Sequence, residues 1–309
     1  MSGANGMSTT AAPGGAETVP APAGDGGGHG GGAGGYGVRR TLPLRVEAVR
    51  QFRRRRTLFA FGILLVLPWV LVAAFQLGGD PGGPDGMPSL VDVATSSALN
   101  FTLFALFVST GFLLVVAVAL FCGDTVASEA GWSSLRYLLA SPVPRARLLR
   151  QKLAVALGYS VVAVLCLPLM SLVAGTAAFG WGPVELPTGG AVPAGTALGR
   201  MAVIVGYALV AQLVVAALAF LLSVTTDSPL GAVGGAVGLV IVSNILDAVT
   251  ALGSWRDFLP THWMYAWMDA LQPQIQWTGM VKGTAVSVTY AVVLFALAFR
   301  RFRTRDVVS

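Results

Sequence analysis

The sequence predicts an all-α integral membrane protein with six transmembrane helices. Of its 309 residues, 55% are hydrophobic and only 11% are charged, whereas a soluble domain carries roughly 25% charged residues. The apolar residues gather into runs of about 20 that almost lack Asp, Glu, Lys and Arg, which is the length that a bilayer core demands. A soluble protein is therefore excluded.

The N-terminal stretch 1–38 is dominated by Gly, Ala, Pro and Ser. It has too few large apolar side chains to offset the entropy lost on ordering. We expect a disordered, Gly-rich cytoplasmic tail.

The next segment, 39–57, contains eight arginines, while Leu44, Ala48 and Phe52 recur at a spacing of four. This pattern predicts a basic interfacial helix with arginines among anionic head groups and apolar residues below them. A solvated basic linker is the alternative. The residues expected at the membrane surface are Arg45, Phe52, Arg53 and Arg54.

Six apolar runs follow and make up a transmembrane domain over 58–303, before a short cytoplasmic tail at 304–309. The expected spans are 58–77, 98–122, 153–175, 201–224, 230–252 and 284–299. Of the 20 Lys and Arg residues, all but Arg200, Arg256 and Lys282 fall before the first span, after the last, or between the second and third. The positive-inside rule then places both termini in the cytoplasm.

The spans lack the residues of an intramembrane enzyme or a metal site. The two histidines lie outside the spans, at His29 and His262, and the two cysteines, Cys122 and Cys166, lie in apolar runs without partners in sequence. Basic residues without interleaved aromatic residues also argue against nucleic-acid binding. We expect neither catalysis nor a bound cofactor.

The chain also lacks an ordinary P-loop. Its two lysines, Lys152 and Lys282, follow Gln151 and Val281, so no Gly-Lys pair exists. Any ATP hydrolysis has to take place on a separate chain.

The connection between the second and third spans has a recognisable design. Val126–Ala140 predicts a short amphipathic helix, Pro142 and Pro144 predict a turn, and a second basic helix is expected from Arg145 into the third span.

This order of residues resembles the inner loop of ABC-2 type exporter permeases. The matching residues are Glu129, Gly131, Ser134, Leu135, Leu138, Leu139, Pro142, Arg145 and Lys152, preceded by Gly123 and Asp124. The match covers about thirty residues, and Trp132 and Ser133 depart from it where many relatives have smaller or Thr-containing sequence, so the docking surface is expected to differ in detail.

The resemblance extends to a segment before the last span. In Pro260–Ile275 the apolar residues form a stripe at helical spacing, rich in tryptophan, which fits the outer head-group layer. By resemblance this is a re-entrant segment on the outer side, and the alternative is a simple aromatic anchor. Its residues are Trp263, Met264, Trp267, Met268, Leu271 and Ile275.

The resemblance implies a permease subunit in the plasma membrane of a bacterium. Its inner helix would dock on a dimer of cytoplasmic ABC ATPases, which bind ATP and Mg, and a second permease, identical or homologous, would complete the pathway. The alternative is a membrane scaffold or assembly protein that recruits a cytoplasmic partner without transport. The scattered polar residues of the spans leave the substrate open.

Overall fold

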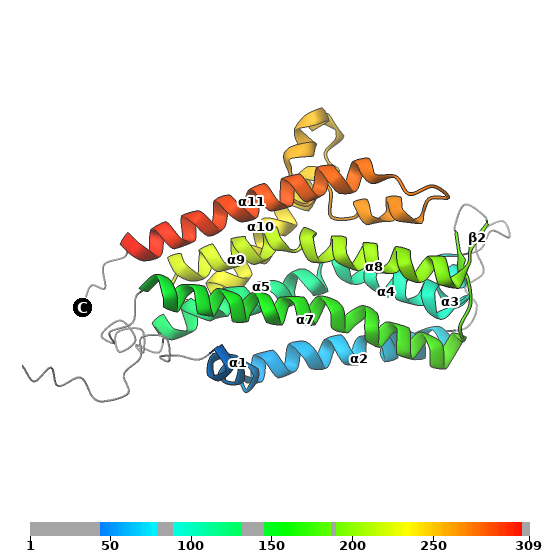
Figure 1. The fold of residues 1–309 in the computed structure, drawn as a ribbon, viewed down its shortest axis with the longest axis horizontal. Coiled ribbons are helices and arrows are strands. Elements are labelled where there is room, and N and C mark those ends of the chain that lie inside the picture. The colour runs from blue at the N-terminus through cyan, green and yellow to red at the C-terminus, as the bar shows by residue number, and fades with distance from the viewer. Residues whose placement is uncertain (1–43, 79–88, 132–144, 187–189, 305–309) are drawn as a thin grey trace, which may run out of the picture. The chain divides into compact units, whose positions relative to one another are not determined.

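The computed structural model describes residues 44–78, 89–131, 145–186 and 190–304. The chain divides into two units, 1–39 and 40–309, and the second is described below. The tail predicted at 1–38 and the last five residues lie outside the described part. The elements, shown in Figure 1, are α1 Leu44–Phe52, α2 Arg55–Leu77, α3 Leu90–Thr95, α4 Ala98–Thr110, α5 Leu113–Gly131, α7 Arg145–Phe179, β1 Val184–Glu185, β2 Ala191–Val192, α8 Ala194–Ala211, α9 Leu213–Thr225, α10 Pro229–Ala248, η2 Thr250–Phe258, η3 Ala266–Leu271 and α11 Trp277–Thr304.

Five helices, with α8 and α9 taken together, are long and apolar enough to cross a membrane, and the bent pair α4–α5 adds a sixth. The chain is therefore an all-α, multi-pass membrane protein, as predicted. The predicted spans fall on these helices, but the helices are mostly longer. The fifth ends earlier than expected, at Ala248 rather than 252, where the chain continues as the 3₁₀ helix η2.

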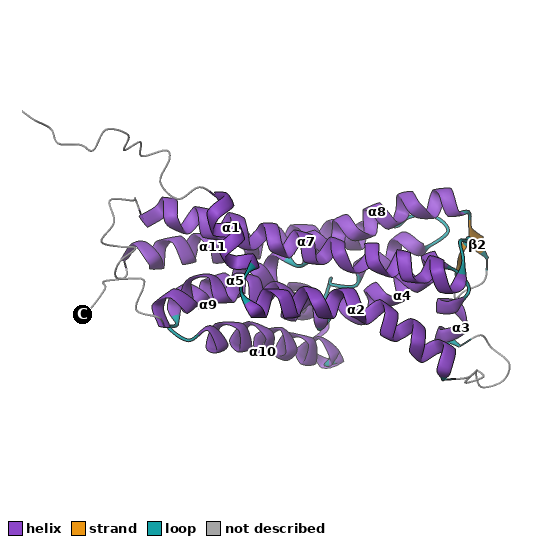
Figure 2. Ribbon diagram, turned by 90° about the horizontal axis from the view of Figure 1, so that it is seen from below, coloured by secondary structure: helices purple, strands orange, loops and turns teal. Residues whose placement is uncertain are grey.

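The helices run alongside one another in a bundle with α5 and α9 at its centre (Figures 1 and 2). In the α8–α9 span, 67% of residues in the most apolar window are buried, against 17% in α2 and 22% in α10 and α11. These three helices leave large apolar side chains exposed, among them Phe59, Ile245 and Val292. Such surfaces require lipid or another protein to cover them.

Serine caps mark three helix starts. Ser89 and Asp92 form a capping box at α3, and Ser97 accepts the backbone N–H of Asn100 at α4. Ser228 accepts the N–H of Gly231 at α10, where Pro229 occupies the first turn. These side chains satisfy amide groups that a helix start leaves without partners.

The second span, predicted as one helix over 98–122, is instead bent by 56° between α4 and α5. Gly111 lies at the break, and a Cβ atom there would collide with the Tyr265 hydroxyl. Gln212 donates its side-chain N–H to the Thr110 carbonyl at 3.2 Å. The break is tolerated because a neighbouring span satisfies a carbonyl that the interruption leaves free.

The predicted amphipathic helix over Val126–Ala140 is wrong in its first part, because α5 continues without interruption to Gly131. Residues 132–144 lie outside the described part. The second basic helix is confirmed: α7 begins at Arg145 and runs 35 residues to Phe179.

The segment between α10 and α11, which we predicted on the outer side and call the outer segment, also differs from its prediction. It forms two short 3₁₀ helices, η2 and η3, rather than one amphipathic α-helix. Met264 and Trp267 are each 1% exposed, whereas Met268 is 40% exposed. A 3₁₀ helix repeats every three residues, so the buried side is not the predicted stripe. Trp267 is thus in the protein interior and not in a head-group layer.

Candidate functional site

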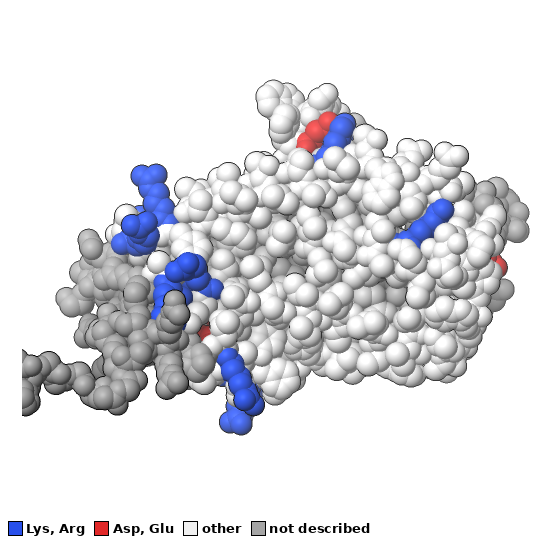
Figure 3. All heavy atoms as spheres, viewed as in Figure 1, with Lys and Arg blue, Asp and Glu red and all other residues white. Residues whose placement is uncertain are grey.

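Basic side chains gather at one end of the bundle, where α7 begins and α11 ends (Figure 3). We call this the basic end. The long middle surface in the same view is almost free of charge. Among the residues that the sequence singled out around the connection between the second and third spans, the exposure of Gly123, Asp124 and Lys152 is described, and all three are buried here.

Asp124 on α5 accepts two arginines from the start of α2. Arg54 Nη1 lies 2.6 Å from Asp124 Oδ2 and 2.8 Å from Ser128 Oγ, and Arg56 Nη1 lies 2.8 Å from Asp124 Oδ1. The Asp124 side chain is 9% exposed. Its carboxylate therefore fixes the α1–α2 junction to α5 by charge-assisted hydrogen bonds.

Helix α1 is held to α7 by a second ion pair. Lys152, whose side chain is 3% exposed, lies 3.2 Å from Glu47 Oε1, and Glu47 also contacts Arg50 at 2.6 Å. Burial raises the pKa of Glu47, but the positive charges of Lys152 and Arg50 outweigh this effect, so its pKa is lowered below 4.5. Glu47 is thus ionised at neutral pH and neutralises the buried ammonium.

Two further hydrogen bonds complete the docking of α1. Gln51 donates to the Phe121 carbonyl on α5 at 3.2 Å, and the Tyr159 hydroxyl on α7 donates to the Ala48 carbonyl at 2.8 Å. The Tyr159 ring also lies within 6.5 Å of Phe52, Phe61 and Phe121. Helix α1 therefore joins α5 to α7 at the basic end.

The part of α5 nearer the basic end lies close to α9 and α10. A Cβ atom on Gly123 would lie 2.9 Å from Val233 Cγ2 and 3.3 Å from the Val233 backbone nitrogen. On the α9 side, buried Ser223 accepts the backbone N–H groups of Val126 and Ala127, both at 3.0 Å. Position 123 requires a glycine because α5 and α10 approach each other closely there.

The other predicted residues divide into three groups. Arg45, Phe52 and Arg53 are exposed, as an interfacial position requires, but Arg54 pairs with Asp124 where we expected it among head groups. Only the helical backbone of Glu129, Gly131 and Arg145, at the ends of α5 and α7, is described. Outside the described residues lie Leu135, Leu138, Leu139 and Pro142.

Sequence reasoning missed Glu47, Gln51, Tyr159 and Ser223. Glu47 had one signal, because it is the only acidic residue in the arginine-rich stretch 39–57. Anionic head groups would repel a carboxylate, so a single Glu among eight arginines indicates that this side chain pairs with a basic residue of the protein. The other three have no distinguishing pattern.

A second polar cluster joins the end of α10 to the outer segment. Asp247 Oδ1 lies 2.5 Å from His262 Nδ1 and 3.3 Å from Arg256 Nε, and Ser243 is hydrogen bonded to Thr261 at 2.7 Å. Among the residues that the structure describes, no group of three or more His, Cys, Asp and Glu side chains could hold a metal ion. The cluster connects the C-terminal end of α10 to residues 256–262.

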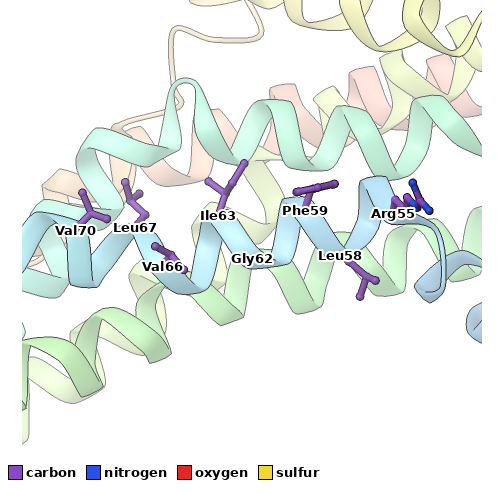
Figure 4. A pocket seen from close by; sticks show the side chains of 8 residues that line it. All are labelled: Arg55, Leu58, Phe59, Gly62, Ile63, Val66, Leu67 and Val70. Carbon is purple, nitrogen blue, oxygen red and sulfur yellow. The ribbon is translucent and has the colours of Figure 1, made fainter.

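An open groove of about 790 Å³ runs along one side of α2. Figure 4 shows that its lining side chains all come from this helix. They are Arg55, Leu58, Phe59, Gly62, Ile63, Val66, Leu67 and Val70.

Two comparisons with known proteins extend over most of the chain. Residues 70–308 match the family described as "Protein of unknown function (DUF2705)". The chain is also 26% identical over 228 residues to the uncharacterized protein YhcI of Bacillus subtilis (strain 168), across 70% of this chain and 68% of that protein.

Proposed function

Because the chain belongs to the DUF2705 family of proteins of unknown function, its activity has to be argued from its own residues, and we propose that it is the permease subunit of an ATP-driven ABC exporter. In this proposal two copies, or this chain and a homologous one, form the pathway through a bacterial plasma membrane. Two ABC ATPases beneath them bind ATP and Mg. The basic end is the cytoplasmic side, in accord with the positive-inside rule.

The observation that carries the proposal is the connection of α1 to both helices that flank residues 132–144. Helix α5 ends seven residues after Asp124, and α7 begins seven residues before Lys152. Asp124 binds the α1–α2 junction, and Lys152 binds α1 itself. A force applied to the chain between α5 and α7 would therefore move α1, α5 and α7 together.

The second span supplies an element that could respond to such a force. Its inner half, α5, carries the Asp124 contacts, whereas its outer half, α4, is separated from it by the 56° bend at Gly111. Bends of this kind can absorb a change in helix direction. ATP-driven movement at the basic end would then change the angle between the two halves.

The partner copy is supported by the apolar groove on α2. Six spans enclose little space, and the exposed side chains of this groove need either lipid or a neighbouring helix. A second permease at α2 would cover them.

The experiment is co-reconstitution of the full chain with an ABC ATPase encoded beside its gene. In proteoliposomes we expect this chain to stimulate ATP hydrolysis at least threefold, and a cysteine at Leu138 to crosslink to the ATPase. The variants Glu129→Gln and Arg145→Gln should lose most of the stimulation, while Arg303→Gln, at the end of α11, should retain it.

A scaffold would behave differently. It would bind the same partner, and Leu138→Cys would crosslink to it, but ATP hydrolysis would not change. Absence of both binding and stimulation would refute the permease proposal.

A further inference from the structure

Two apolar grooves lie side by side on α2, and both start at the basic end. The groove described above, of about 790 Å³, starts at Arg55. A second groove, of about 270 Å³, starts at Arg56 and runs between α2 and α5. Its lining side chains on the α5 side are Leu113, Val116, Ala117 and Leu120. Each groove thus combines an apolar lining with one cationic end.

Phe59 and Ile63 separate the two grooves, because both residues line each of them. Their side chains are 72% and 53% exposed and lie along the same edge of α2 (Figure 4). Gly62 lies between this ridge and Leu58, and a Cβ atom at Gly62 would meet nothing within 4 Å. The larger groove therefore has an open floor at Gly62 that an acyl chain could occupy.

The length of the larger groove corresponds to the depth of one lipid leaflet. From Arg55 to Val66, α2 rises about 16 Å at 1.5 Å per residue, and one leaflet makes up about 15 Å of a 30 Å hydrocarbon core. Helix α2 is itself long and apolar enough to cross the bilayer. With Arg55 among the head groups, the apolar part of the groove lies at the depth of the acyl chains.

Positive charge exceeds negative charge where both grooves begin. Residues 53–56 are four consecutive arginines, and two of them share the single carboxylate of Asp124, which leaves a local charge of +3. The other two, Arg53 and Arg55, are exposed, and the described part of the chain gives neither of them a carboxylate partner. Guanidinium groups bind phosphate through paired hydrogen bonds. The charge at this position is therefore complementary to an anionic head group.

We propose that α2 and α5 bind an anionic phospholipid with two acyl chains, in the leaflet at the basic end. Its phosphate lies at Arg55 and Arg56, and one chain occupies each groove, on either side of Phe59 and Ile63. A zwitterionic lipid also brings a positive charge towards the arginines, so it gains less. This lipid site is independent of an ATPase and of the proposed transport function, and a second copy at α2 would pack against the bound lipid.

The test measures lipid binding to the full chain, delipidated in a neutral detergent, by native mass spectrometry. Phosphatidylglycerol is compared with phosphatidylcholine of the same chains and with lyso-phosphatidylglycerol, which has the same head group but one chain. We expect one phosphatidylglycerol to bind saturably and about tenfold more tightly than either of the others. Phosphatidylcholine lacks the net negative charge, and the lyso form leaves one groove empty.

The role of the arginines is tested by a single charge removal. Arg55→Gln should weaken phosphatidylglycerol binding about fivefold, the effect of one arginine near an anionic surface, and should leave phosphatidylcholine binding unchanged. Arg303→Gln is the matched control, because it removes the same charge from the end of α11, across the bundle from α2 (Figure 1). It should change the binding of neither lipid.

The two-groove arrangement is tested at Gly62. Gly62→Leu should fill the floor of the larger groove without a clash in the fold. Phosphatidylglycerol should then bind little better than its lyso form, because only the smaller groove stays open. Gly158→Leu makes the same change at an open position of α7 and should keep the preference for two chains. The unfolding temperature of each variant in detergent reports whether it is folded.

Three results would overturn the proposal. Phosphatidylglycerol and phosphatidylcholine could bind equally well, or Arg55→Gln could have no more effect than Arg303→Gln. The third is a dimer, identified by its mass, to which no phosphatidylglycerol binds, because a second copy would then fill the grooves in place of the lipid.

Discussion

Arg54 and Asp124 are 70 residues apart in sequence, yet the guanidinium Nη1 of Arg54 lies 2.6 Å from the Asp124 Oδ2. The pair joins the α1–α2 junction to α5, the half of the second span that lies at the basic end. Asp124 also receives Arg56. The nearly buried Asp124 carboxylate thus fixes the position of the arginine-rich segment 53–56 relative to α5.

The first prediction concerns this carboxylate. Asp124→Asn should destabilise the protein by about 1–3 kcal/mol, mainly through Arg54, because Arg56 is largely exposed and its pair is screened by solvent. Thermal unfolding in detergent measures the effect. Arg53→Gln, at a neighbouring exposed position, should change the unfolding temperature little, and equal behaviour of the two variants would contradict the assignment.

The second prediction tests the ion pair between Glu47 and Lys152. Glu47→Gln leaves a buried ammonium beside a neutral amide and should cost about 2–3 kcal/mol, somewhat below the value for a fully buried pair. The double variant Glu47→Gln, Lys152→Met should recover most of this loss, since neither charge remains. A double-mutant cycle measures the coupling. Additive losses would show that the two side chains do not interact.

The docking of α1 should depend on pH in one direction. The pKa of Glu47 is lowered in the folded state, so its contribution is complete above about pH 4.5 and is lost as pH falls through the lowered pKa. A spin label at exposed Arg45→Cys should be immobile at neutral pH and become mobile only well below pH 4.5. Release of the label at pH 5–6 would be inconsistent with this linkage.

A further prediction compares two glycines. Gly123→Ala brings a methyl group against Val233 and should cost about 1–3 kcal/mol by overpacking. Gly158→Ala meets nothing within 4 Å on α7 and should be neutral or stabilising by up to about 1 kcal/mol. Because Val233→Ala removes the nearest side-chain atom but not the backbone, it should rescue Gly123→Ala only in part.

The spans were predictable because each depends on a local run of apolar residues. The start of α7 near Arg145 was also predictable, since Pro142 and Pro144 disfavour a helix before it. The bend at Gly111 was not, because glycine is common in transmembrane helices and Tyr265, which occupies the space beside it, is far away in sequence.

The candidate site likewise combines residues that the local sequence predicted with partners that only the fold reveals. The sequence singled out Gly123, Asp124 and Lys152, and these residues are buried at the basic end. Their partners Glu47 and Arg54 belong to a segment that its composition alone assigns to the membrane surface. Ion pairs over such separations have no local pattern, so only the fold reveals them.

The last prediction concerns the hold of Asp247 on the outer segment. Helix η2 has no buried residue, so hydrophobic burial contributes little to its position. Asp247 fixes it instead through Arg256 and His262. Asp247→Asn should therefore increase backbone hydrogen exchange across 250–263 by about tenfold, equivalent to about 1.4 kcal/mol, while α10 remains protected.

Asp257→Asn is the matched control, because this side chain is 50% exposed and lies 3.5 Å from the other ring nitrogen of His262. It should change exchange in the same region much less than Asp247→Asn does. If the two variants had the same effect, the charge around His262 as a whole, and not the contact with α10, would hold the segment. If neither had an effect, the buried side chains of Met264 and Trp267 would be sufficient to anchor it.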